Sequence, residues 1–217
     1  MTEIVIATSN PHKFRELVGL LALPGIRWRS LRSLRSLRDC SRLPVVREDG
    51  RTFEANAAKK ARIIARATGC LALADDSGIE VEALEWAPGV RSARFAGRHG
   101  DDEANNAKLL KRLRGLPPSR RRARYRCALA LADPRGLIGV VQGRWAGWIA
   151  FAPRGRGGFG YDPLFVVPRL GKTVGQLPAR VKQRLSHRAQ AARRLRPLLR
   201  RVVLSGPEQA GLVRRGC

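Results

Sequence analysis

The sequence is poor in acidic side chains and in aromatic residues, and it has no long hydrophobic run. Its 217 residues include 17 Asp and Glu against 43 Lys and Arg, and aromatic residues make up only 6%. No apolar run reaches the roughly 20 residues that a membrane-spanning helix needs. The chain begins Met1-Thr2-Glu3 and then turns apolar, without the basic segment that opens a secretory leader. These absences favour a cytoplasmic protein.

Cysteine is scarce, and its spacing carries no signature. Cys40, Cys70, Cys127 and Cys217 lack metal-ligand spacing and show no disulfide pattern, so reduced thiols are the expectation. The hydrophobic content of 44% fits a globular chain whose length allows one large or two small domains. We expect a single domain over residues 1–205 and a flexible tail over 206–217.

Positive charge is concentrated in the second half of the chain. Residues 1–110 carry a net charge of +4, and residues 111–217 carry +22. Charge of this sign allows non-specific contact with nucleic acids. Only seven of the 43 basic residues are lysine, however, and such a preference for arginine is also typical of GC-rich genomes. A basic nucleic-acid-binding protein therefore stays open as an alternative to an enzyme.

The periodicity of apolar residues predicts a mixed α/β fold with functional groups at strand ends. Helices are expected at 11–21, 53–67 and 101–114 and along the Arg-rich C-terminal segment, and strands at 4–7, 71–74, 79–82, 124–132, 137–142, 143–151 and 164–167. Residues 30–38 repeat Leu-Arg-Ser three times and are expected to form a connector or an irregular helix.

The most informative motif is the pair Asp75-Asp76, which follows the apolar run 71–74. Adjacent carboxylates at a strand end can bind a divalent cation, raise one another's pKa or act as a base. Glu48, in a predicted turn, offers a third oxygen ligand of the kind that Mg²⁺ prefers. A solvated turn explains Glu48 alone more readily, and a turn with a helix cap explains the Asp pair about equally well.

Two further motifs offer hydrogen-bond donors. Thr8-Ser9-Asn10, followed by Lys13, leaves a strand and enters a helix, where backbone N–H groups can cradle an anion. Helix capping alone explains Ser and Asn more readily. Near the C-terminus, Lys182 and the run Ser186-His187-Arg188 suit carbonyl or phosphate recognition, with a basic helix cap as the plain alternative.

A glycine-rich loop over residues 157–163 has the sequence Gly-Gly-Phe-Gly-Tyr-Asp-Pro. Phe159 and Tyr161 offer ring faces to a nucleobase, and Asp162 offers an acceptor. A flexible hairpin loop is the alternative.

Taken together and in this order, the motifs resemble the inosine triphosphate pyrophosphatase family over about residues 3–200. The resemblance rests on Val5–Asn10 with Lys13 and Glu16, Thr52–Ala57 with Lys60-Ala61, Ala74–Gly78, Pro88–Val90 with Ser92–Arg94, Gly157–Pro163, Gly171–Thr173, and Lys182 with Ser186–Arg188. Two departures from the family pattern are Gly175-Gln176-Leu177 in place of Ala-Glu-Leu and Gln183 after the motif lysine.

The resemblance implies hydrolysis of ITP, dITP and XTP between the α- and β-phosphates, with Mg²⁺, by a homodimer. It implies an elongated, two-lobed α/β fold, with a mixed sheet flanked by helices and a substrate cleft between the lobes. Glu48 and Asp76 would bind the metal with Asp75 in support, and Asp76 would be the base that activates water. The implied substrate-binding residues are Thr8, Ser9, Asn10, Lys13, Lys60, Ser77, Phe159, Gly160, Tyr161, Asp162, Lys182, His187 and Arg188.

Overall fold

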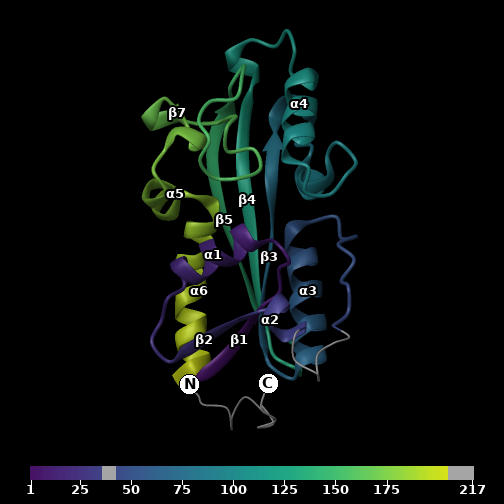
Figure 1. Cartoon of the computed structure of the whole chain (residues 1–217), viewed down its shortest axis with the longest axis vertical. Coiled ribbons are helices and arrows are strands. Elements are labelled where there is room, and N and C mark those ends of the chain that lie inside the picture. The colour runs from purple at the N-terminus through teal and green to yellow at the C-terminus, as the bar shows by residue number, and fades with distance from the viewer. Residues whose placement is uncertain (36–42, 205–217) are drawn as a thin grey trace. The chain divides into compact units, whose positions relative to one another are not determined.

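The computed structural model describes residues 1–35 and 43–204 of the chain (Figure 1). The chain divides into two compact units. Unit 1 comprises Met1–Asp76, Ala128–Gln142 and Ala191–Cys217, and unit 2 comprises Ser77–Cys127 and Gly143–Gln190. Residues 36–38 of the Leu-Arg-Ser repeat and the predicted tail, 206–217, lie outside the described residues.

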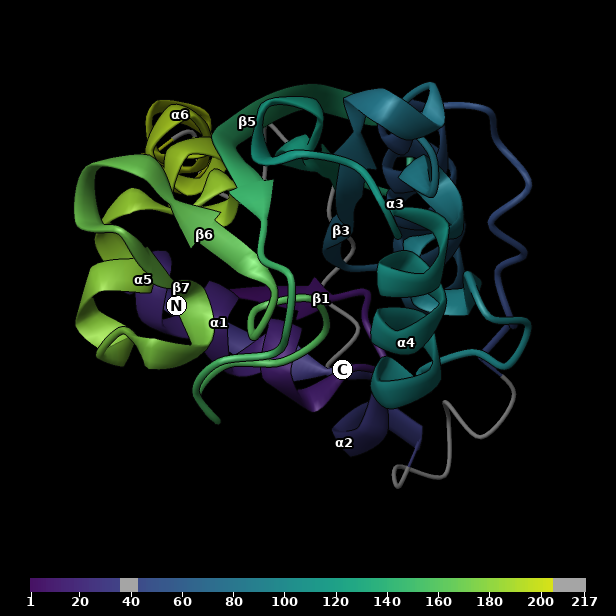
Figure 2. The same ribbon diagram turned by 90° about the horizontal axis from the view of Figure 1, so that it is seen from above.

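The described strands form one mixed sheet in the order β2-β1-β3-β4-β5-β6-β7. The strands are β1 (Thr2–Ile6), β2 (Ile26–Ser30), β3 (Leu71–Val81), β4 (Arg122–Ala132), β5 (Leu137–Ile149), β6 (Phe165–Val167) and β7 (Lys172–Thr173). The α-helices are α1 (Pro11–Leu20), α2 (Leu31–Arg35), α3 (Phe53–Thr68), α4 (Asp102–Arg112), α5 (Ala179–Leu185) and α6 (His187–Leu204). In unit 1, α3 and α6 lie on opposite sides of β1, and in unit 2, α4 and α5 lie on opposite sides of β5 (Figures 1 and 2). The predicted mixed sheet flanked by helices is confirmed.

Helices α1 and α3 begin and end where their capping residues predict. The Asn10 side chain accepts hydrogen bonds from the backbone N–H groups of His12 and Lys13, and Pro11 follows as the first helical residue. Thr52 caps α3 through the Ala55 N–H, and Gly69 ends it with a left-handed φ of 68°. These signals are local, so they could be read from the sequence.

Strand β3 corrects the prediction of two strands, 71–74 and 79–82, with a turn between them. It is continuous from Leu71 to Val81, and Ser77 is its only residue that is not buried. Gly78 permits this course, because a Cβ there would lie 2.3 Å from Ser92 Oγ and 2.7 Å from the Gly89 carbonyl oxygen. The two aspartates therefore lie inside a buried strand. The ranges 137–142 and 143–151 likewise join into the single strand β5.

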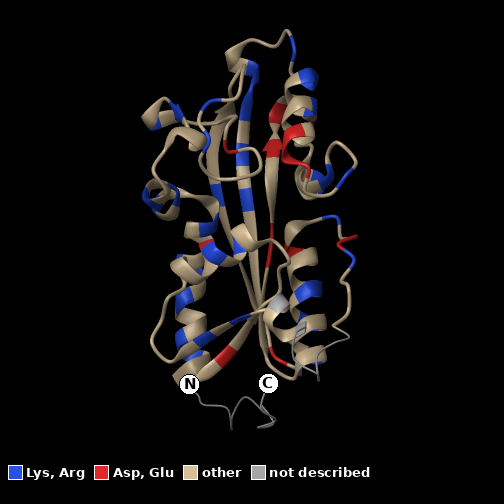
Figure 3. Cartoon of the chain, viewed as in Figure 1, with Lys and Arg blue, Asp and Glu red and all other residues tan. Residues whose placement is uncertain are grey.

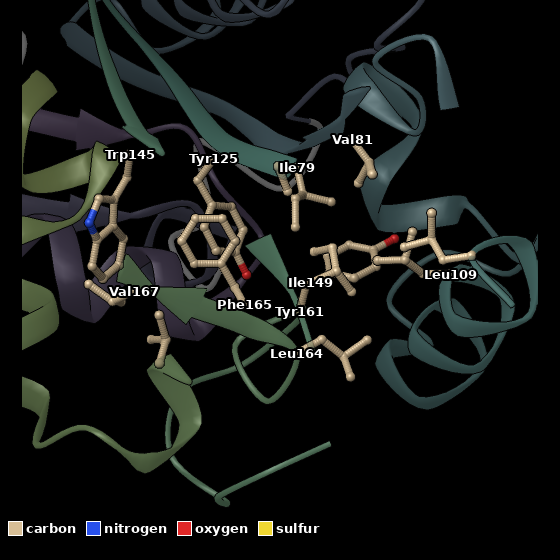
Figure 4. Close-up of a cluster of buried hydrophobic side chains, with 13 residues drawn as sticks. Ile79, Val81, Leu109, Tyr125, Trp145, Ile149, Tyr161, Leu164, Phe165 and Val167 are labelled. Carbon is tan, nitrogen blue, oxygen red and sulfur yellow. The ribbon is translucent and has the colours of Figure 1, made fainter. Parts of the chain in front are cut away.

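The core of unit 2 is built around aromatic residues (Figure 4). The Phe165 ring is fully buried and lies 4.6 Å from the Tyr125 ring and 5.6 Å from the Trp145 ring, centroid to centroid. Both pairs are tilted, at 45° and 47°, which is a favourable aromatic geometry. Tyr161 and Leu164 complete the labelled centre of this core.

Basic residues are prominent on the C-terminal helix α6. Figure 3 shows Lys and Arg along α6, a helix whose sequence contains no acidic residue. None of the helices in the described residues combines the length and apolar character that a membrane crossing requires.

The two described cysteines differ in state. Cys127 is a buried free thiol, but Cys70 is in a disulfide bond, so the expectation of reduced thiols is wrong for Cys70.

Candidate active site

Unit 1 brings together the carboxylates that the sequence singled out. Asp75 is fully buried and Asp76 is 4% exposed, both in the middle of β3. Glu48 lies in the irregular segment before α3, and its side chain is 25% exposed. The aspartates that follow the apolar run 71–74 in the sequence are therefore buried in the structure.

Two of these three carboxylates, Asp75 and Glu48, each contact a lysine. Lys13 Nζ, on α1, lies 2.7 Å from Asp75 Oδ1. Lys60 Nζ, on α3, donates to Glu48 Oε1. The ammonium groups compensate charge that would be costly to bury alone.

Asp76 is held by a neutral group instead. Asn56 Nδ2 donates to Asp76 Oδ2 over 2.9 Å, and Asn56 is itself 1% exposed. The Oδ1 atom of Asn56 accepts from the Gly50 N–H at 2.7 Å, which ties Asp76 to the segment that carries Glu48. Sequence reasoning missed Asn56, although its position within the Thr52–Ala57 motif on the buried face of α3 was a usable signal.

The pKa values of Asp76 and Glu48 shift in opposite directions. Burial, followed by the charge of Glu48, raises the pKa of Asp76 from 3.8 to about 6, against the opposing influence of Lys13, Lys60 and Asn56. Burial alone would raise the pKa of Glu48 as well, but the charge and hydrogen bond of Lys60, together with the charge of Lys13, outweigh it and lower that pKa below 4.5. Two carboxylates with separated pKa values can play different chemical roles.

The donor set of unit 1 fits a divalent cation. Within the described part of the chain, no three His, Cys, Asp or Glu residues form a group that could itself hold a metal ion. Mg²⁺, however, is commonly bound through one or two carboxylates together with substrate phosphates. The Glu48 charge raises the pKa of Asp76, so these two oxygen ligands repel each other, and a cation would relieve that repulsion.

The segment 8–13 contains the N-terminal cap of α1. Thr8 Oγ1 accepts from the Asn10 N–H at 3.2 Å, and Asn10 Oδ1 accepts from the His12 N–H at 2.8 Å. The capping interpretation is therefore confirmed, while Ser9 is exposed in front of the helix. Lys13 is the member of this segment that joins the carboxylate group.

In unit 2, the residues of the glycine-rich loop gather around Asp162. Lys182 Nζ lies 2.6 Å from Asp162 Oδ2, and the Phe159 N–H donates to the same oxygen at 2.9 Å. Tyr125, which sequence reasoning missed, donates its hydroxyl to Asp162 Oδ1 at 3.1 Å. Asp162 is 1% exposed and Lys182 is 7% exposed, so this cluster is buried.

The Phe159 ring is flanked by cations. Lys182 Nζ lies 4.1 Å from the ring centroid and the Arg188 guanidinium carbon lies 5.7 Å from it. Arg188 also donates to Ser77 Oγ at 2.8 Å. The His187 ring stacks on Tyr125 at 4.6 Å and 9°.

Helix α4 fixes the tip of the same loop. Asp102 Oδ2 accepts from the Gly160 N–H at 2.6 Å, and Asn106 Nδ2 donates to the Gly160 carbonyl at 2.9 Å. The Tyr161 hydroxyl donates to the Ser92 carbonyl at 2.8 Å. Gly160 is therefore held by α4 through both its N–H and its carbonyl, and the ligand-binding role of the loop stays a prediction.

These two groups define the class of protein. Carboxylates interleaved with lysines suit a metal-bound polyphosphate, and an aromatic ring flanked by cations suits a planar base. Each group, taken by itself, is a feature that a nucleotide-processing α/β protein requires.

Comparison with known proteins gives the family. The chain belongs to the Ham1 family, whose model matches residues 4–198. It is 48% identical over 192 residues to the dITP/XTP pyrophosphatase of Geobacter sulfurreducens, a match that covers 88% of this chain and 93% of that protein. This confirms the resemblance seen in the sequence.

Solved structures agree with this assignment. A Ham1 protein from Coxiella burnetii has a TM-score of 0.81 and 38% identity, with 93% of this chain and 100% of that chain covered. A nucleoside-triphosphatase/dITP/XTP pyrophosphatase from Mycobacterium abscessus has a TM-score of 0.72 and 44% identity, with 90% and 100% covered.

Proposed function

We propose that this protein hydrolyses dITP, XTP and ITP to the nucleoside monophosphate and pyrophosphate, and so removes purine nucleotides with altered bases. Relatives that carry the name dITP/XTP pyrophosphatase, and that match along most of the chain, support the reaction and the substrate class. The structural observation that carries the proposal is the group of Glu48, Asp75 and Asp76 with Lys13 and Lys60 beside them.

In this proposal Glu48 and Asp76 bind Mg²⁺, with Asp75 in support. The ion supplies neutralisation of phosphate charge and a water of lowered pKa. Asp76 accepts the proton of the water that attacks the α-phosphorus, while the bond from that phosphorus to the bridging oxygen breaks and pyrophosphate leaves. Asn56 orients the Asp76 carboxylate for this transfer through its bond to Oδ2.

The triphosphate is bound by positive and hydrogen-bonding groups of unit 1. Lys13 and Lys60 supply charge, and Thr8, Ser9 and Asn10 contact the phosphates from the residues before α1, where the helix dipole favours an anion. The His12 and Lys13 N–H groups bond to the Asn10 side chain, so these contacts come from side chains. Preorganised charge of this kind stabilises a phosphoryl-transfer transition state without moving during the reaction.

The base is recognised by unit 2. Phe159 stacks on the ring, Gly160, Tyr161 and Asp162 shape the pocket, Ser77 contacts the nucleotide, and Lys182, His187 and Arg188 donate hydrogen bonds. Hypoxanthine and xanthine offer a 6-oxo acceptor to such donors, whereas adenine offers an amino group. An unmade buried hydrogen bond costs roughly 1–3 kcal/mol, which discriminates against adenine by about one to two decades per contact.

The test is pyrophosphate release from ITP, XTP, GTP and ATP with and without Mg²⁺. We expect turnover of ITP and XTP well above that of ATP, and its collapse in Asp76→Asn. The matched control is Asp49→Asn, which removes an exposed carboxylate that pairs with Lys59 at 2.7 Å and is expected to keep activity. A folded wild type that leaves ITP and XTP intact would refute the proposal.

Three finer properties belong to the same proposal. The protein acts as a homodimer in the cytoplasm, where the free nucleotide pool lies, and sedimentation velocity tests the oligomeric state.

A groove of about 810 Å³ on α6 supports additional non-specific contact with nucleic acids, because it is lined by the exposed residues Arg193, Arg200 and Arg201. The test is binding of duplex DNA at several salt concentrations. A binding constant whose logarithm falls linearly with the logarithm of the salt concentration would support this contact, and no binding at low salt would refute it.

A further inference from the structure

Asp162 organises a buried hydrogen-bond cluster in unit 2. Its Oδ2 accepts from Lys182 Nζ at 2.6 Å and from the Phe159 N–H at 2.9 Å, and its Oδ1 accepts from the Tyr125 hydroxyl at 3.1 Å. With 1% exposure and both oxygens bonded to donors of the chain, this carboxylate is placed to hold other groups. Its two principal partners, Lys182 and Phe159, are the ones that the proposed function assigns to the base.

Tyr125 connects this cluster to the rigid core of the unit. Its ring lies on β4 and packs against Phe165 at 4.6 Å (Figure 4). It also stacks on the His187 ring at 4.6 Å. Burial, followed by the charge of Asp162, raises the pKa of the Tyr125 hydroxyl well above 10.0, so the hydroxyl remains a donor at any working pH. The side chain thus anchors the loop carboxylate to a strand.

We infer that Tyr125 is a positioning residue for base selection: its hydroxyl fixes the Asp162 carboxylate, which in turn fixes the Lys182 ammonium beside the Phe159 ring. The inference rests on the proposed function, in which Phe159 stacks on the base. Tyr125 itself touches neither the base nor the phosphates in this scheme.

The physical reason lies in the geometry of the lysine. An ammonium group has three donors, so one can bond to Asp162 while another is directed at the 6-oxo group of a purine. Lys182 Nζ lies over the Phe159 ring, 4.1 Å from its centroid, so a base that stacks on this face in an offset arrangement would meet the ammonium with its edge. Without the hydroxyl, the Asp162 carboxylate loses the donor to its Oδ1 and can rotate, and the direction of the lysine donor becomes less fixed. A lysine donor whose direction is less fixed discriminates less between a 6-oxo purine and a 6-amino purine.

The test is Tyr125→Phe, which removes the hydroxyl and keeps both ring contacts. We expect the preference for ITP over ATP, measured as the ratio of kcat/KM values, to fall about 5- to 20-fold, because Tyr125 acts on the base only through Asp162 and so transmits only part of the effect of a lost hydrogen bond to a charged group. The fall should come mainly from a higher KM for ITP, with its kcat changed less than about twofold. The matched control is Thr173→Val, which removes another buried hydroxyl of unit 2, bonded to the Arg154 carbonyl at 2.6 Å, and is expected to keep the wild-type preference.

A double-mutant cycle then tests whether Tyr125 acts through Asp162. If it does, Tyr125→Phe has little further effect on the preference in an Asp162→Asn background, so that the two changes are strongly non-additive. Additive effects, or an equal fall of kcat/KM for ITP and ATP that leaves the preference unchanged, would overturn the inference and indicate a general structural role.

Failure of the inference is distinguishable from failure of the proposed function. A wild type that prefers ITP, together with a Tyr125→Phe variant of unchanged preference, overturns the inference alone. A wild type that neither hydrolyses ITP nor binds it in calorimetry overturns both.

Discussion

Asp76→Asn is expected to stabilise the metal-free protein at alkaline pH while it abolishes activity. The carboxyl is 4% exposed, and burial and Glu48 raise its pKa from 3.8 to about 6. Because the folded state binds the proton more tightly than the unfolded state, the contribution of this group to stability is fully present below about pH 4 and is lost as pH rises through about 6. At pH 8 the wild type must therefore bury an ionised carboxylate.

The magnitude follows from the shift. A pKa difference of about 2 corresponds to about 3 kcal/mol at 1.36 kcal/mol for each pKa unit. The neutral amide of asparagine avoids this cost, and its oxygen can still accept from Asn56 Nδ2. At about 2–4 °C per kcal/mol for a chain of this size, the melting temperature at pH 8 should rise by up to about 10 °C.

The assay is thermal unfolding in EDTA at pH 4.5 and pH 8, for the wild type, Asp76→Asn and the control Asp49→Asn. The gain from Asp76→Asn should be full at pH 8 and about a third as large at pH 4.5, where the carboxyl is already largely ionised in the unfolded state but still protonated in the folded state. Asp49 behaves in the opposite sense, because its hydrogen bond to Lys59 lowers its pKa, so its replacement should bring no gain at pH 8. Equal melting-temperature differences at the two pH values, or a less stable Asp76→Asn at pH 8, would refute the reasoning. Mg²⁺ should raise the melting temperature of the wild type at pH 8 and leave that of Asp76→Asn unchanged.

Three further substitutions test the packing around the two groups. Lys13→Met leaves the fully buried Asp75 without the ammonium at 2.7 Å, and we expect a loss of about 3–5 kcal/mol in chemical denaturation together with loss of turnover; a stability within 1 kcal/mol of wild type would contradict the burial of this charge. Gly78→Ala puts a Cβ 2.7 Å from a backbone oxygen and should cost about 1–3 kcal/mol, whereas an unchanged melting temperature would show that β3 is not so closely packed there. Lys182→Arg keeps the charge but forces a larger planar group into a site that is 7% exposed, and we expect a reduced ITP preference and a lower melting temperature. The control Lys59→Arg, at a pair whose lysine side chain is 37% exposed, should be neutral, and equal effects of the two changes would argue against a steric cause.

The local part of the fold could be predicted from the sequence because capping is a short-range interaction. Asn10 and Pro11 begin α1, and Thr52 and Gly69 bound α3, through contacts within four residues along the chain. The course of β3 could not be predicted in this way. Asp75, Asp76 and Gly78 read as a turn, whereas the close approach of Gly78 to Ser92 and Gly89 within the strand is a tertiary contact that the local sequence does not reveal.

The residues of the candidate site likewise fall into those that local sequence reveals and those that only tertiary contacts reveal. Carboxylates and lysines were recognisable because they are rare residue types in distinctive motifs. Asn56 and Tyr125 were not, because each matters through a partner 20 or 37 residues away, a separation that only tertiary packing closes. Tyr125 in particular fits the apolar face of a strand, and nothing local reveals that its hydroxyl bonds to a buried carboxylate.

The choice of lysine at three positions adds a physical argument to the assignment of the site. Only seven of the 43 basic residues are lysine, yet Lys13, Lys60 and Lys182 each pair with a carboxylate of the two groups. A guanidinium is planar and spends two donors side by side on one carboxylate, whereas an ammonium can bond to a carboxylate with one donor and direct the others elsewhere. A site that must hold its own carboxylates and also bind a polyanion needs the second arrangement. An enzyme of nucleotide hydrolysis therefore accounts for both the acidic groups and the lysines beside them, which general basicity of the chain does not.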